Sequence, residues 1–225
     1  MKSGNRAARR WLQWAISPAL LMLALLANAQ PGLATAAQVQ GPKPRTVLVL
    51  GDSLSAAYGL APTQGWVALT GERIARAKPG WRVVNASISG ETSAGGAARV
   101  VREVVLHRPS VVVIELGAND ALRGLPLRQT RTNLARMIGA AQGVGAEVLL
   151  LGMRIPPNYG AAYTQEFERS YRDLAKRFDA RLLPFFLEPI ARDRDAFQGD
   201  NLHPVASVQP KLRDHVWTVL EPMLE

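Results

Sequence analysis

Two short segments far apart in the chain carry residues that together could cleave an acyl bond. Ser53 follows Gly51 and Asp52 after an apolar run, at a predicted sheet edge near the start of the next helix. Asp200 and His203 lie three residues apart near the other end of the chain. A serine hydroxyl needs a base to take its proton, and a histidine base works best when a carboxylate fixes its tautomer. These residue types predict a Ser53-His203-Asp200 triad.

Each segment also has an ordinary structural interpretation. Gly-Asp-Ser is common turn and helix-capping chemistry. The segment from Asp200 to Pro204 could start a helix, with Pro204 in its first turn. Both interpretations can hold at once, because a capped helix start is also a rigid mount for a catalytic histidine.

Acyl transfer further needs hydrogen-bond donors aimed at the oxyanion of the tetrahedral intermediate. Gly90 can bring its backbone N–H close to a ligand, and Asn119 can supply a side-chain amide. Taken singly, Gly90 could belong to a plain turn and Asn119 to a helix start. Four separate loops would then each carry a suitable residue type by accident, so we expect them to form one site.

The elements that must position these residues follow a regular alternation after Thr46. Short apolar runs at 47–50, 83–85, 111–116, 148–151 and 182–183 predict strands. Amphipathic runs at 66–77, 97–107, 127–141, 166–178 and 206–220 predict helices. The pattern predicts a single α/β domain, a three-layer α/β/α sandwich around a parallel five-stranded sheet. Ligands bind such sheets at the carboxyl ends of the strands, where these loops fall.

The N-terminus has the residue order of a secretory signal peptide. Four basic residues within 2–10 precede an apolar run at 11–26, and small residues follow at 27–29 and 34–36. We expect a signal peptide at 1–29, cleaved after Ala29 or near Ala36, then a disordered lead-in at 30–45 and the folded domain at 46–225. The alternative is an uncleaved anchor, but a spanning helix needs about 20 apolar residues, and this run is shorter and interrupted.

Charge and cysteine content narrow the function classes. The net charge of +9 falls to +5 when the basic N-terminus is removed, and no Lys/Arg cluster is interleaved with aromatics, which argues against nucleic-acid binding. The absence of cysteine excludes disulfides, thiolate metal sites and a cysteine nucleophile. We expect an exported monomer, periplasmic or secreted from a bacterium, with a small-molecule substrate and no stable membrane insertion after cleavage.

The motifs together resemble the GDSL or SGNH hydrolase family, named for a Ser, a Gly, an Asn and a His in four sequence blocks. Matches to the four blocks are Gly51-Asp52-Ser53, Gly90, Gly117-Ala118-Asn119-Asp120 and Asp200 to Pro204. The resemblance covers nearly all of the chain after Thr46. It implies a flavodoxin-like fold with Ser53 as nucleophile, His203 as base and Asp200 as its orienting acid. It also implies an oxyanion hole of the Ser53 and Gly90 N–H groups with the Asn119 side chain, and no cofactor or metal.

Further stretches at 85–93, 115–117 and 157–160 resemble the periplasmic branch of multifunctional thioesterases, lysophospholipases and arylesterases. This resemblance implies acyl ester, thioester or lysophospholipid substrates. It also implies that the segment 153–160 borders the acyl groove, with Ile155, Pro156 and Tyr159 offered to the chain. The same segment could be an ordinary connection after the fourth strand.

Other functions stay open beside this one. A carbohydrate O-deacetylase of the same family is one. A metal-dependent phosphoesterase could use Asp52, Asn119, Asp200 and His203 as ligands, although the sequence has no clustered ligand motif. A non-enzymatic module could cradle a phosphate in the Ser53 loop, although Gly-rich phosphate signatures are absent.

The remaining histidines and two further acids fit structural roles. His107 follows one amphipathic helix and His215 lies inside another, so we predict packing or surface positions for both. Asp52 and Asp120 flank candidate catalytic residues and are predicted to brace turns rather than to carry protons.

Overall fold

The computed structural model describes residues 44–225, so the predicted signal peptide, both cleavage positions and most of the lead-in lie outside the described residues. The strands are β1 (Arg45–Gly51), β2 (Trp81–Asn85), β3 (Val111–Glu115), β4 (Glu147–Leu151) and β5 (Arg181–Leu183). The α-helices are α1 (Trp66–Ala77), α2 (Ser93–His107), α3 (Ala118–Leu122), α4 (Leu127–Gln142), α5 (Ala161–Phe178) and α6 (Gln209–Leu220).

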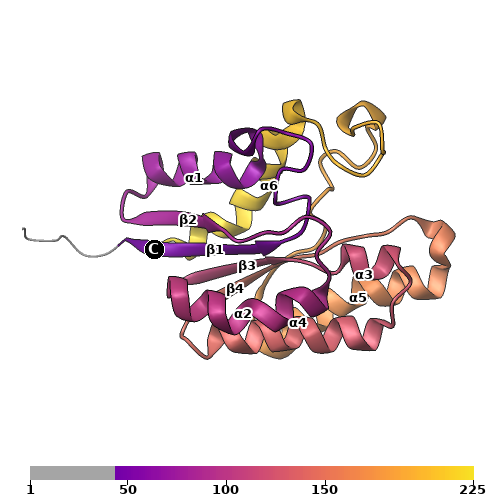
Figure 1. Ribbon diagram of the computed structural model, residues 1–225, viewed down its shortest axis with the longest axis horizontal. Coiled ribbons are helices and arrows are strands. Elements are labelled where there is room, and N and C mark those ends of the chain that lie inside the picture. The colour runs from indigo at the N-terminus through magenta and orange to yellow at the C-terminus, as the bar shows by residue number, and fades with distance from the viewer. Residues whose placement is uncertain (1–43) are drawn as a thin grey trace, which may run out of the picture. The chain divides into compact units, whose positions relative to one another are not determined.

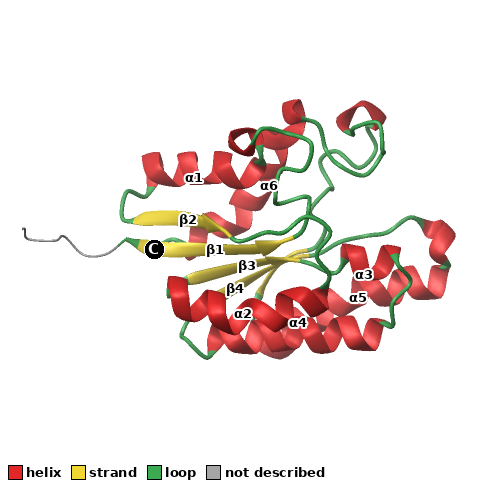
Figure 2. Ribbon diagram, in the orientation of Figure 1, coloured by secondary structure: helices red, strands yellow, loops and turns green. Residues whose placement is uncertain are grey.

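The strands form one parallel sheet in the order β2-β1-β3-β4-β5 (Figure 2). Strand β1 is an inner strand, and its Val47 pairs with Val83 on one side and Val111 on the other. Because an inner parallel strand is covered on both faces, it can be continuously apolar, and residues 47–50 are at most 2% exposed. The predicted parallel five-stranded sheet is confirmed.

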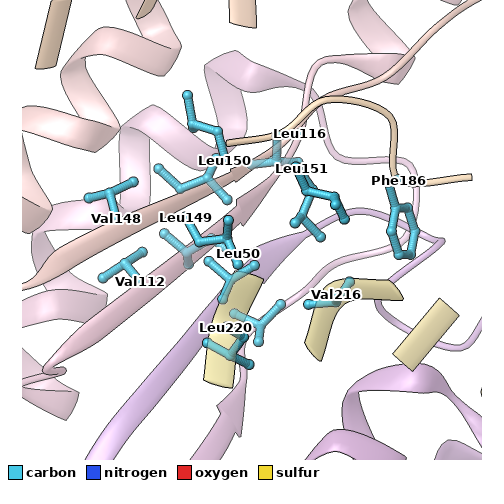
Figure 3. Packing of buried hydrophobic residues seen from close by; sticks show 14 of the residues in the cluster. Leu50, Val112, Leu116, Val148, Leu149, Leu150, Leu151, Phe186, Val216 and Leu220 are labelled. Carbon is cyan, nitrogen blue, oxygen red and sulfur yellow. The ribbon is translucent and has the colours of Figure 1, made fainter. Parts of the chain in front are cut away.

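Helices cover the sheet on both faces (Figure 1). Helices α1 and α6 pack together on one face, and α2, α4 and α5 line up on the other. Figure 3 shows Leu50 of β1 pointing toward Val216 and Leu220 of α6, within one continuous apolar core. Burial of this core supplies the main stabilising free energy, and it fixes the strand ends from which the site is built.

The strand order creates a natural binding position at the carboxyl end of β1. The connection through α1 leads from β1 to β2 on one side, whereas α2 carries the chain back past β1 to β3. Helices that leave toward opposite faces open a crevice at such a switch point. The loops that follow β1, β2 and β3 therefore meet there, and these are the loops that carry Ser53, Gly90 and Asn119.

Element boundaries differ from the predicted ones where the hydrophobic pattern is weak. Helix α2 begins at Ser93 rather than at 97, because Gly95 and Gly96 at its start carry no side chain to show the periodicity. Gly96 packs closely enough that a Cβ would lie 2.5 Å from Cδ1 of Leu116. Helix α5 begins at Ala161 rather than at 166, and the short helix α3 was not among the predicted elements.

Candidate active site

Ser53 lies in a tight turn directly after β1. Gly51 ends the strand where a side chain would not fit, since a Cβ there would lie 2.6 Å from Cβ of Ser55. Oδ1 of Asp52 accepts the Leu54 N–H at 3.0 Å and so closes the turn around Ser53, the bracing role predicted for this aspartate. The next α-helix begins at Trp66, so Ser53 does not lie at the start of an α-helix as the sequence suggested.

Asp200 and His203 come from a short hairpin rather than from a helix start. The Gln198 N–H donates to the His203 carbonyl at 2.7 Å and closes the hairpin. Asn201 at its tip has φ +56°, a left-handed conformation that asparagine tolerates better than most residues. Oδ1 of Asp200 accepts the N–H groups of Leu202 and His203 at 2.9 and 3.0 Å, so acid and base are held as one unit.

The structure brings the three predicted triad residues into one hydrogen-bonded line. Oγ of Ser53 lies 2.8 Å from Nε2 of His203, and Nδ1 of His203 lies 2.6 Å from Oδ2 of Asp200. The bond to His203 lowers the pKa of Asp200 to about 2, and the two backbone N–H groups add to this shift. An ionised acceptor on Nδ1 leaves Nε2 free to take the Ser53 proton.

The predicted oxyanion donors lie at the same edge. Gly90 has φ +76°, a backbone conformation that favours glycine, although a Cβ there would meet nothing within 4 Å. Within residues 44–225, neither the Gly90 N–H nor the Ser53 N–H donates to a protein acceptor. Nδ2 of Asn119 donates to Oδ2 of Asp52 and to the Glu91 carbonyl, both at 3.1 Å. The N–H groups of Ser53 and Gly90 are thus free to bind an oxyanion, and the Asn119 amide lies at the same edge of the sheet.

A cavity of about 530 Å³ joins these groups to an apolar wall. Ser53, Gly90, Asn119 and His203 all line it. The apolar part of the wall includes Leu122, Met153, Ile155, Pro156, Phe185, Leu187 and Phe197. Ile155 and Pro156 thus occupy the predicted position, whereas Tyr159 is not part of the wall. The Tyr159 hydroxyl instead donates to the carbonyl of Leu122, one of the wall residues, at 3.1 Å.

A pair of buried acids lies directly beneath the site. Asp52 is 1% exposed, and burial raises its pKa to about 6. Glu115, the last residue of β3, is fully buried, and burial together with the nearby Asp52 charge raises its pKa well above the usual value. Oε2 of Glu115 accepts the Ser55 hydroxyl at 2.8 Å. Two adjacent buried carboxyls cannot both ionise readily, so the pair holds a proton to higher pH than separate exposed carboxyls would.

The other polar residues that the sequence raised lie away from the reacting atoms. Nε2 of His107 is 3.4 Å from Glu103, and Nε2 of His215 is 3.0 Å from the Phe185 carbonyl, so both histidines make structural contacts. Asp120 accepts the Ser93 N–H at 2.8 Å and holds the start of α2. These placements agree with the structural roles predicted for them.

Three residues near the site escaped the sequence reasoning. The Tyr58 ring lies against the His203 ring with centroids 4.4 Å apart. Gln198, in the hairpin that carries His203, donates a hydrogen bond to the Tyr58 carbonyl and so connects the two loops. Glu115 could have been noticed, because it is a carboxylate directly after a continuous buried apolar run. Tyr58 and Gln198 lie in loops of no regular period, and their sequence neighbourhoods carry no comparable signal.

The parallel sheet and the Ser53, His203 and Asp200 contacts at its edge define an acyl hydrolase with a serine nucleophile, and comparison with known proteins agrees. Residues 49–208 match the model of the GDSL-like lipase/acylhydrolase family, and the chain belongs to that family. The resemblance noted in the four sequence blocks is therefore confirmed.

Characterised relatives are similar over most of their length. Esterase TesA of Pseudomonas aeruginosa is 49% identical over 180 residues, covering 80% of this chain and 90% of that protein. Thioesterase 1/protease 1/lysophospholipase L1 of Escherichia coli K12 is 40% identical over 183 residues, covering 80% and 85%. The crystal structure of the psychrotrophic esterase EstA from Pseudoalteromonas, inhibited by monoethylphosphonate, is 40% identical with a TM-score of 0.77, covering 80% and 98%.

Proposed function

We propose that this hydrolase cleaves acyl esters and thioesters through an acyl-enzyme on Ser53. His203 takes the Ser53 proton at Nε2 while Oγ attacks the substrate carbonyl carbon, and the Ser53 and Gly90 N–H groups with the Asn119 amide stabilise the oxyanion. The proton passes from His203 to the leaving alkoxide or thiolate. Water then attacks the acyl-enzyme by the same route and releases the acid. The observation that carries the proposal is the continuous Ser53-His203-Asp200 contact at 2.8 and 2.6 Å.

The cavity favours substrates with an apolar acyl chain. Its wall beyond the triad is built from aliphatic and aromatic side chains such as Ile155, Leu187 and Phe197. The names of the relatives include esterase, thioesterase, lysophospholipase and arylesterase, which supports a carbonyl-directed enzyme with several leaving groups. A kinetic panel of p-nitrophenyl esters, acyl-CoAs and lysophospholipids of increasing chain length decides the order of preference.

The alternatives have less support. An O-deacetylase removes only an acetyl group, which needs little of this apolar wall. A metal-dependent phosphoesterase needs a ligand cluster, and no group of three or more His, Cys, Asp or Glu side chains in residues 44–225 is arranged to hold an ion. A phosphate-binding module gives no reason for an imidazole to lie 2.8 Å from the Ser53 hydroxyl.

The decisive experiment labels the nucleophile. A fluorophosphonate should add one adduct mass at Ser53, and Ser53→Ala should lose both the adduct and at least about 10⁴-fold of the esterase activity. The phosphonate-inhibited EstA structure makes this reagent class a natural choice. EDTA should leave the wild-type rate unchanged. Full esterase activity in Ser53→Ala would refute the assignment, and a loss in EDTA would favour the metal-dependent alternative.

We also infer export through the N-terminal segment, with cleavage after Ala29 or near Ala36. Support comes from the basic, apolar and small-residue order of residues 2–36. No helix within residues 44–225 combines the length and apolar character that crossing a bilayer requires. The N-terminal sequence of the protein recovered from the periplasm or medium tests both the export and the cleavage position.

A further inference from the structure

The Asp52 carboxylate connects two parts of the site that are far apart in the chain. Its Oδ1 accepts the Leu54 N–H at 3.0 Å and fixes the turn that carries Ser53. Its Oδ2 accepts from Nδ2 of Asn119 at 3.1 Å. One buried side chain therefore controls the position of both the Ser53 N–H and the Asn119 amide, which must point at the same oxyanion.

The Asn119 amide would be poorly fixed without this acceptor. Asn119 lies near the start of α3, a helix of five residues, and its side chain is only partly buried. The amide carries two N–H hydrogens. In the resting enzyme one is directed to Asp52 and the other to the Glu91 carbonyl. Because both hydrogens lie in one rigid amide plane, the bond to Asp52 also fixes the direction of the second hydrogen.

Glu115 keeps Asp52 in the state that this task needs. Oε2 of Glu115 accepts the Ser55 hydroxyl at 2.8 Å and faces the Asp52 N–H at 3.4 Å. Its other oxygen, Oε1, is buried and finds no hydrogen-bond donor among residues 44–225. Burial raises the pKa of Asp52, and its side-chain hydrogen bond with Glu115 acts in the opposite direction, which favours Asp52 as the acceptor for Asn119.

We propose that Asp52 is a positioning residue that holds the Asn119 amide in register with the Ser53 turn, so that the donors of the oxyanion hole keep a fixed relative position. The inference rests on the proposed function of Ser53, Gly90 and Asn119. It assigns the GDS aspartate to transition-state stabilisation through Asn119 rather than to proton transfer.

A double-mutant cycle on the purified enzyme tests this role. Asp52→Asn keeps one oxygen for the Leu54 N–H but turns an NH₂ group toward the Asn119 amide, where two donors repel. Its kcat should fall by roughly 10- to 100-fold with KM nearly unchanged, because the lost contact acts on the transition state. Asn119→Ala should lose about 10²–10³. The double variant should be within about threefold of Asn119→Ala alone, since the aspartate acts through that amide.

Asp120→Asn is the matched control, because Asp120 is a buried aspartate next to Asn119 whose oxygens accept from Ser93 and Thr130 instead. Any loss of kcat in Asp120→Asn should multiply with the loss in Asn119→Ala when the two substitutions are combined. If Asp52→Asn does not fold, Asp52→Ser still offers a hydroxyl for the Leu54 N–H and replaces it in the cycle.

The positioning role is overturned if the kcat losses of the Asp52 and Asn119 substitutions multiply in the double variant. It is also overturned if a folded Asp52 variant keeps the wild-type kcat. Ser53→Ala separates this failure from failure of the proposed function. If Ser53→Ala is inactive, only the role of Asp52 is lost, whereas an active Ser53→Ala removes the proposed function itself.

Discussion

At the scale of single residues, the Asp200 carboxylate binds Nδ1 of His203 while remaining partly exposed to solvent. Its side chain is 38% exposed, yet both oxygens are committed: Oδ1 to two backbone N–H groups and Oδ2 to Nδ1 of His203. The resulting pKa of about 2 keeps it ionised throughout the range in which the enzyme could work. A loss of activity on mild acidification therefore originates elsewhere in the site.

Replacing Asp200 by asparagine should nearly abolish turnover while leaving the hairpin intact. The asparagine oxygen can keep the backbone bonds, but its NH₂ group then faces Nδ1 of His203 and forces the hydrogen onto Nε2. His203 can no longer accept the Ser53 proton, so kcat should fall by on the order of 10⁴. Steady-state kinetics with a p-nitrophenyl ester measure the loss.

The matched control for Asp200 is Asp193→Asn, an exposed aspartate whose Oδ1 also accepts a backbone N–H at 3.0 Å but which touches no histidine. Its kcat should stay within about threefold of wild type, as for a surface change away from the site. A loss below threefold in Asp200→Asn would reject Asp200 as the partner of His203.

Residue chemistry made much of the site predictable from the sequence. Few residue types can serve as nucleophile, base or orienting acid, so Ser53, His203 and Asp200 could be proposed without coordinates. Glu115 could not be assigned in this way, because its partner Asp52 lies 63 residues earlier and the pairing exists only once β1 and β3 lie side by side.

At the scale of elements, Gln198 fastens the histidine hairpin to the loop after β1. Its Nε2 donates to the Tyr58 carbonyl at 2.9 Å and to the Pro204 carbonyl at 3.2 Å. The Tyr58 ring in turn rests on the His203 ring. The distance from His203 to Ser53 thus depends on a contact between two loops as well as on the strands beneath them.

Gln198→Ala should loosen the hairpin and lower kcat by about tenfold, because small displacements of a catalytic group are costly to a reaction that needs alignment. Gln142→Ala removes a comparable bond from Nε2 to the Phe178 carbonyl, between the ends of α4 and α5, and should leave kcat unchanged. Equal kcat values in the two variants would show that the hairpin holds its position without Gln198.

The burial and contacts of each element explain how well the sequence predicted it. The inner strands β1, β3 and β4 are mainly runs of β-branched and leucine residues, and burial on both faces favours that composition. The start of α2 and the hairpin at 197–204 depend instead on tertiary contacts, such as the Asp120 bond to Ser93, which no local pattern carries. Helix α3 is too short for a hydrophobic period to appear.

At the scale of the whole molecule, the acid pair of Asp52 and Glu115 gives folding stability a dependence on pH. Both pKa values are raised in the folded protein, so the folded state binds more protons than the unfolded chain above about pH 4. The stabilising contribution of this pair is fully present below the pKa values of the unfolded chain. It is lost as pH rises through the pKa values of the folded protein. Surface acids such as Glu168, whose pKa is lowered by its bond to Arg172, act in the opposite direction.

Glu115→Gln should remove the part of this decline in stability that comes from Glu115, because glutamine occupies similar space and cannot ionise. Near pH 4.5 the two proteins should differ little, and toward pH 8 the variant should gain up to about 1.4 kcal/mol per pH unit over wild type. Urea unfolding at a series of pH values measures the difference. Glu168→Gln serves as the control of opposite sign, since its loss of stability relative to wild type should develop below about pH 5 and stay constant from there to pH 8. A Glu115→Gln difference that does not change with pH would mean that Glu115 is not the proton carrier of the pair.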